Sequence, residues 1–97
     1  MRTGTAVPTA QLTIDDVDVV VVLLDSSFED ESLERKRARQ AALQQSAARA
    51  GLTGPVVAVW QDPRGRTRFL APPEQHAFFQ IVSYNQLRAQ VNRTLEG

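Results

Sequence analysis

The sequence predicts an α+β domain with α/β-like connectivity, made of two layers in the order β-α-β-β-α around a mixed sheet of three or four strands. Residues 19–24 form an unbroken apolar run, residues 28–50 have the composition of a long helix, and residues 62–65 have that of a hairpin turn. Because the chain has 97 residues, we expect one domain with a modest core.

The apolar run, with its lead-in from Val17, is predicted to be the central strand. Four consecutive valines, residues 19–22, favour a strand because branching at Cβ suits a pleated surface better than a helix. Both sets of alternating positions are apolar, so neither face of the strand can be left in water. The run is too short to cross a bilayer, which needs about 20 apolar residues.

The N-terminal end is divided between an arm and a short strand. Residues 1–9 hold small residues and Pro8 with no apolar core of signal-peptide length, and we expect a flexible arm. Residues 10–14 alternate apolar and polar, which is typical of a half-buried strand. This segment is either an edge strand that turns back into the central strand or a lead-in continuous with it, and we favour the hairpin. A single domain would then span residues 10–97.

A long helix is predicted over residues 28–50. Ser26 and Ser27 are good N-cap residues, and acidic side chains crowd the first turns, where they complement the helix dipole. Gly51 suits the left-handed conformation that ends a helix. One side of this helix, which we expect against the sheet, carries Ala38, Ala41, Ala48 and Leu52. A second side, interpreted as scattered surface residues in preference to a partner-facing stripe, carries Leu33, Leu43 and Ala47.

A β-hairpin is predicted over residues 56–70. Pro63 and Gly65 stand at the positions that a type I turn followed by a glycine bulge prefers. This turn sets Asp62 opposite Arg66, Trp60 opposite Arg68, and Val59 opposite Phe69. One face, expected to be core, then carries Val57, Val59, Thr67 and Phe69. The other, an amphipathic mixture, carries Ala58, Trp60, Arg66, Arg68 and Leu70.

The last region, from residue 72 onward, is predicted to be helical, since proline is tolerated in a first helical turn. Ser83 and Gln86 have the spacing of a capping box, so the region is either one helix or two with a bend near Ser83. Phe78 and Phe79 add apolar surface outside the main stripe, which consists of Ala77, Ile81, Tyr84, Val91 and Leu95. Burial on more than one side is expected over residues 77–82.

Connectivity leads to a prediction about assembly. In a three-stranded sheet the central strand would lie at an edge, which is unfavourable for a strand apolar on both faces. Either residues 10–14, a second subunit, or both must cover that edge. We predict a homodimer, and a monomer whose arm and helices suffice is the alternative.

Composition and motifs argue against catalysis. The net charge is formally zero and gives no long-range attraction to nucleic acid or to a membrane. No cofactor or metal site is expected, because no phosphate loop, nucleophile motif or ligand cluster is present. Asp25 is interpreted as a helix cap, and His76, the single histidine, as a partly exposed surface residue. The absence of cysteine fits a reducing compartment, and we expect a cytoplasmic protein.

The candidate interaction surface consists of Trp60, Arg64, Arg66, Arg68, Phe78 and Phe79. We expect a small non-enzymatic module that self-associates and acts through a protein partner. The alternative is a binder of single-stranded nucleic acid that stacks a base on Trp60 among the three arginines. The same face could instead hold a cation–π pair of Trp60 with Arg68 that stabilises the hairpin, and this structural interpretation is favoured.

Overall fold

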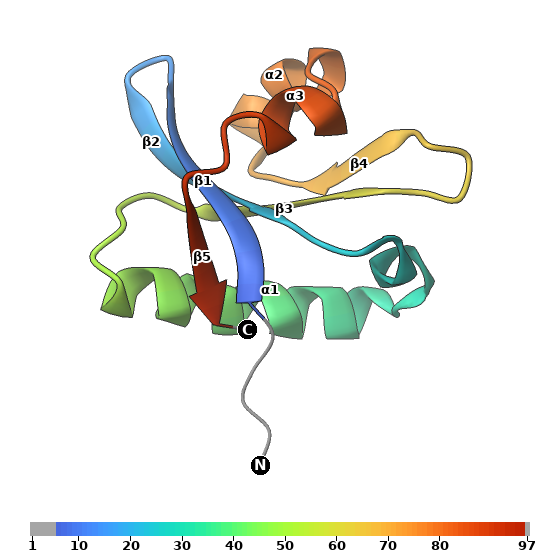
Figure 1. The fold of residues 1–97 in the computed structure, drawn as a ribbon, viewed down its shortest axis with the longest axis horizontal. Coiled ribbons are helices and arrows are strands. Elements are labelled where there is room, and N and C mark those ends of the chain that lie inside the picture. The colour runs from blue at the N-terminus through green and yellow to red at the C-terminus, as the bar shows by residue number, and fades with distance from the viewer. Residues whose placement is uncertain (1–5, 97) are drawn as a thin grey trace.

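Five strands form one mixed sheet in the order β4-β3-β2-β1-β5 (Figure 1). The computed structural model describes residues 6–96. Only β2 and β3 pair in parallel, while the other neighbours are antiparallel. The elements are β1 (Ala6–Ile14), β2 (Val17–Leu23), the 3₁₀ helix η1 (Ser26–Asp30), α1 (Leu33–Arg49), β3 (Val56–Gln61), β4 (Thr67–Leu70), the 3₁₀ helix η2 (Pro73–Gln75), α2 (His76–Ile81), α3 (Tyr84–Arg88) and β5 (Arg93–Glu96).

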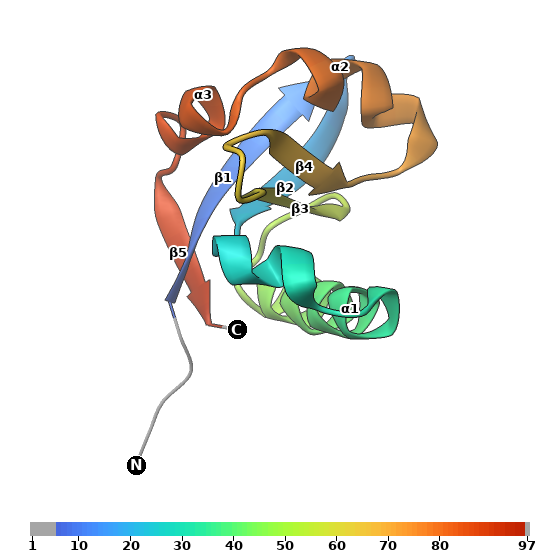
Figure 2. The ribbon, with the colours of Figure 1, turned by 90° about the vertical axis from the view of Figure 1, so that its right-hand side faces the viewer.

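The predicted α+β class and mixed sheet are confirmed, but the number of strands and of layers was underestimated. Helix α1 covers one face of the sheet, and α2 and α3 cover the other (Figures 1 and 2). The prediction of two layers is therefore wrong. Alternation along β2 explains the third layer: Val20 and Val22 pack in the α1 core, whereas Val19 and Val21 pack in the α2–α3 core. All four valines are fully buried, as expected for a strand covered on both faces.

The hairpin between β1 and β2 is confirmed, and it gives β2 the neighbour that its edge needed. Leu12 pairs with Val19 and Ile14 with Val17. The two-residue turn places Asp15 and Asp16 at φ values of 51° and 67°. Two successive left-handed residues define a type I′ turn, whose twist matches that of the flanking strands.

The arm was predicted over residues 1–9, of which residues 1–5 lie outside those that the structure describes. Residues 6–9 belong to β1, which extends past β2 and pairs with β5, with Val7 opposite Leu95. This part of the arm prediction is wrong. Pro8 lacks a backbone N–H, which argued against a strand here. It pairs with Thr94 of β5 and lies one residue before the pairing with β2 begins, so it is not held between two strands.

Helix α1 begins at Leu33 and not at Phe28 as predicted. The residue before it, Ser32, is the N-cap, and its Oγ accepts a hydrogen bond from Arg35 N at 3.1 Å. Residues 26–30 instead form η1, which ends at Glu31 in an extended conformation. Phe28 is buried, and its ring centroid lies 4.8 Å from that of Trp60. This contact with β3 explains why residues 26–30 form a separate 3₁₀ helix and not the first turns of α1.

The side of α1 that packs on the sheet is not the predicted one, although Leu52, just past the end of the helix, is buried as predicted. Leu43 and Ala47 are fully buried, while Ala38, Ala41 and Ala48 are exposed. Small side chains thus face solvent here. Leu43 and Ala47, predicted to be scattered surface residues, pack in the core instead, whereas Leu33 is 55% exposed as that prediction expects.

Two glutamines on the inner side of α1 explain this orientation. Gln44 Oε1 accepts a hydrogen bond from Val56 N at 2.8 Å, and Gln44 Nε2 donates to Gly54 O at 3.1 Å. Gln40 Nε2 donates to Val56 O at 2.7 Å and to Leu70 O at 3.2 Å. Strand β4 reaches only as far as the residue opposite Ala58, so these amides supply the hydrogen bonds that a longer strand would have made at Val56.

The β3–β4 hairpin has the predicted register. Trp60 lies opposite Arg68 and Val59 opposite Phe69. Asp62 N donates to Arg66 O at 3.0 Å, which extends the pairing by one step.

The C-terminal region is divided as the capping signal indicated, but it is not helical to its end. Ser83 and Gln86 form both bonds of a capping box, so α2 and α3 are separate helices joined at residues 82–83. The predicted helical stripe through Leu95 is wrong. Leu95 lies in β5 and is buried in the α1 core, because the outer edge of β1 offers it a strand partner.

Candidate interaction surface

Trp60 is not a surface residue. Its side chain is 2% exposed, and its Nε1 donates a hydrogen bond to Glu29 Oε1 at 2.8 Å. The cation over its ring is Lys36, whose Nζ lies 5.2 Å from the ring centroid, and not the predicted Arg68. Phe28 covers another side of the indole. The stacking contact required by the nucleic-acid hypothesis is therefore closed off in this fold.

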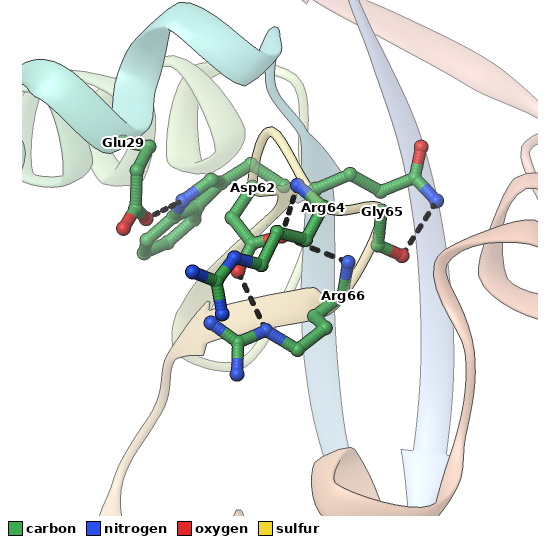
Figure 3. A network of polar contacts seen from close by, with 7 residues as sticks. Glu29, Asp62, Arg64, Gly65 and Arg66 are labelled. Atoms are coloured by element: carbon green, nitrogen blue, oxygen red, sulfur yellow. Dashed lines mark hydrogen bonds and ion pairs between the residues drawn. The ribbon is translucent and has the colours of Figure 1, made fainter.

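The turn that presents the arginines is organised by Asp62 (Figure 3). Its side chain is 4% exposed, and its Oδ1 accepts hydrogen bonds from Arg64 N at 3.0 Å and Arg66 N at 2.9 Å. Its Oδ2 accepts a further bond from Arg66 Nε at 3.0 Å. Gly65 takes φ +82°, the left-handed conformation of a glycine bulge, and its N–H donates to Asp62 O at 2.9 Å.

These contacts change the acidity of the Asp62 carboxyl. The backbone N–H of Arg66 lowers its pKa most, burial opposes this effect, and the Arg66 side chain and Arg64 N–H lower it further. The side chain of Arg66 is held against the turn although it is 63% exposed. Arg64 and Arg68 are exposed as well. The arginines thus remain accessible, but the Trp60 ring opposite Arg68 is buried and cannot stack a base.

Phe78 and Phe79 lie on the other side of the sheet from Trp60. Phe79 is 1% exposed and contacts Phe69 at 5.7 Å between ring centroids. Phe78 is half-buried and meets Phe79 edge-on at 5.1 Å. The six candidate residues are therefore divided between the two faces and do not form one surface.

The side of the molecule around Phe78 is incompletely covered. Helices α2 and α3 have six and five residues, whereas α1, on the opposite side, has 17. Ile81 is 83% exposed, and Val17, which shares the face of Val19 by alternation, is 47% exposed. We call this surface the α2–α3 face. Its partly buried apolar residues are Leu12, Ile14, Phe69, Ala71, Phe78, Val82, Tyr84 and Val91.

The α1 side differs sharply, since only Leu70 is a partly buried apolar residue packed against that core. Sequence reasoning identified the apolar excess around Phe78 but missed Leu12, Ile14 and Ile81 as parts of the same surface. The alternation over residues 10–14 was the available signal for the first two. Nothing in the sequence distinguished Ile81 from a core position, because it falls on the apolar stripe of its helix.

Asp25 and His76 have structural environments. Asp25 Oδ1 accepts from Ser26 N at 2.9 Å and Oδ2 accepts from Ser27 Oγ at 3.1 Å, so this carboxylate caps η1. His76 is exposed, with Nε2 2.8 Å from Ala71 O and its ring edge-on to Phe69 at 5.4 Å. Within residues 6–96, no group of three or more His, Cys, Asp or Glu side chains is placed to hold a metal ion. No helix in that range has the length and apolarity required to span a bilayer.

No protein family model matches this chain, and comparisons with curated proteins and with solved structures found no significant match.

Proposed function

We propose that the protein is a non-enzymatic interaction module that self-associates through its α2–α3 face. The observation that carries this proposal is the unequal covering of the two sides of the sheet. Eight partly buried apolar residues pack against the core on the α2–α3 side, and Ile81 is 83% exposed there. On the α1 side the core has one such residue, Leu70, and Leu33 is the exposed large apolar residue. Apolar surface that is concentrated on one side of a molecule is typical of a protein interface.

The open sheet edge that favoured a dimer is closed in this fold, and the apolar surface around Phe78 remains as the basis for one. Strand β1 flanks β2, so no second subunit is needed at that edge. Apolar surface on one face remains to be covered, and a second copy can cover it through a two-fold contact in which the same patch meets itself. A net charge of zero means that two copies do not repel each other at long range.

Sedimentation velocity over a wide concentration range tests the proposal. We expect dimers that dissociate on dilution, and Ile81→Asp should be monomeric throughout because a dimer would bury its carboxylate. At an 83% exposed position this substitution should leave the fold intact, which circular dichroism will verify.

Leu33→Asp is the matched control. Leu33 is also exposed, at 55%, but it begins α1 on the opposite side of the sheet. The same change of charge there should leave the dimer unaffected. A wild-type protein that stays monomeric up to millimolar concentration, or equal effects of the two substitutions, would contradict the proposal.

A further inference from the structure

A groove runs across the carboxyl end of β2, between the layer of α1 and the layer of α3. It consists of two adjoining cavities of ≈ 350 and ≈ 230 Å³, which share Pro8, Leu23 and Tyr84 as lining residues. Arg88 lines the first cavity, and Asp25 and Arg39 line the second. We call it the β2-end groove. Crevices outside the carboxyl ends of sheet strands are where α/β proteins commonly bind small ligands.

Arg39 is the polar group that the fold leaves unsatisfied in this groove. Its Nε is buried and has no hydrogen-bond partner among residues 6–96. Within the same residues, the ion pairs are those of Arg35 with Glu31 and Arg66 with Asp62, and Arg39 takes no part in them. A buried N–H without an acceptor is unusual in proteins and calls for an explanation, such as a ligand that supplies one.

Asp25, the carboxylate that lines the two cavities, already accepts hydrogen bonds from neighbouring residues. Both oxygens of Asp25 accept hydrogen bonds, from Ser26 N and from Ser27 Oγ. Arg39 and Arg88 against Asp25 give the two cavities a net positive charge. Glu31, which lines an adjoining cavity of ≈ 120 Å³ together with Asp25 and Arg39, is paired with Arg35 at 4.0 Å. The groove therefore favours an anion over a cation.

The apolar residues that line the groove indicate what the rest of the ligand is like. Leu23, Pro8 and Val91 give the larger cavity apolar walls beside the Tyr84 ring. Its size falls in the range of small-molecule sites, which are mostly apolar with a few convergent polar groups. We propose that the β2-end groove binds a small amphipathic carboxylate. Its carboxylate lies at Arg39, where a turn of the flexible side chain directs Nε–H to an oxygen, and its apolar body lies along Leu23 and Pro8.

Amide chemical shifts from two-dimensional ¹H–¹⁵N NMR, with hexanoate as the probe, test this site. Hexan-1-ol is the matched neutral probe, because it has the same apolar chain without the carboxylate. We expect saturable shifts with hexanoate at Leu23, Asp25 and Tyr84, and binding of the alcohol weaker by about tenfold or more, the size of a lost charge-assisted hydrogen bond.

Two variants of α1 make the test specific. Arg39→Met should weaken hexanoate binding by about tenfold, while Arg37→Met, an exposed arginine two residues earlier that does not line this groove, should leave it unchanged. If Arg39→Met does not fold, Arg88→Met at an exposed position must weaken binding instead. Unsaturable shifts up to about 50 mM, equal binding of the alcohol, or wild-type affinity in both groove variants would overturn the proposal.

Discussion

Replacing Gln44 by leucine should destabilise the fold by about 1.5–4 kcal/mol. The substitution keeps helix propensity but removes the acceptor of Val56 N and the donor to Gly54 O. Val56 is 2% exposed, so its N–H cannot turn to water, and an unsatisfied buried donor costs about 1–3 kcal/mol. Gly54 is only partly buried, so losing the bond to its carbonyl should cost about 0.5–1 kcal/mol.

Urea denaturation followed by circular dichroism measures this loss. With an m-value of about 1.5 kcal/mol/M, the transition midpoint should fall by about 1–2.7 M. Gln45→Leu is the control, because Gln45 is the exposed neighbour on the same helix. If the two leucine variants unfold within about 0.5 kcal/mol of each other, the glutamine bonds do not explain which side of α1 is buried.

Two further predictions concern the turns. Because the fold lowers the pKa of Asp62 from its ordinary value of 3.8, the ionised carboxylate stabilises the native state above that value, and the stability is lost as pH falls through the folded pKa. Asp62→Asn should therefore be less stable than wild type at pH 7, with a difference that shrinks below pH 4 in urea titrations; a constant difference from pH 7 to pH 2.5 would count against this role. The double substitution Asp15→Asn and Asp16→Gly should raise stability by about 0.5–1 kcal/mol, because the pair Asn-Gly adopts a type I′ turn more readily. Thermal unfolding measures this gain, and an unchanged or lower melting temperature would refute it.

The candidate site was predictable only in part. The register of the β3–β4 hairpin follows from Pro63 and Gly65, because loop length and turn type set strand pairing locally. The burial of Trp60 does not follow from the hairpin. It depends on Glu29 and Lys36, which lie in other elements more than 20 residues away, and on the break that turns η1 onto β3.

Features that depend on neighbours along the chain follow from local sequence alone. These are the doubly buried strand over residues 19–22, the hairpin turns, and the break at Ser83, where steric preference, turn chemistry and capping operate within a few residues. Which side of α1 faces the sheet depends on tertiary contacts. The side with Gln44 faces inward, and not the side with the alanines, because Gln44 Oε1 accepts the hydrogen bond of Val56 N. The tertiary structure also decided the strand at Leu95, since the edge of β1 that pairs with it is almost 90 positions earlier in the chain. Whether a residue is buried depends on which elements the completed fold packs against it. The hydrophobic pattern of a segment predicts its burial only where that packing follows the period of the helix or strand.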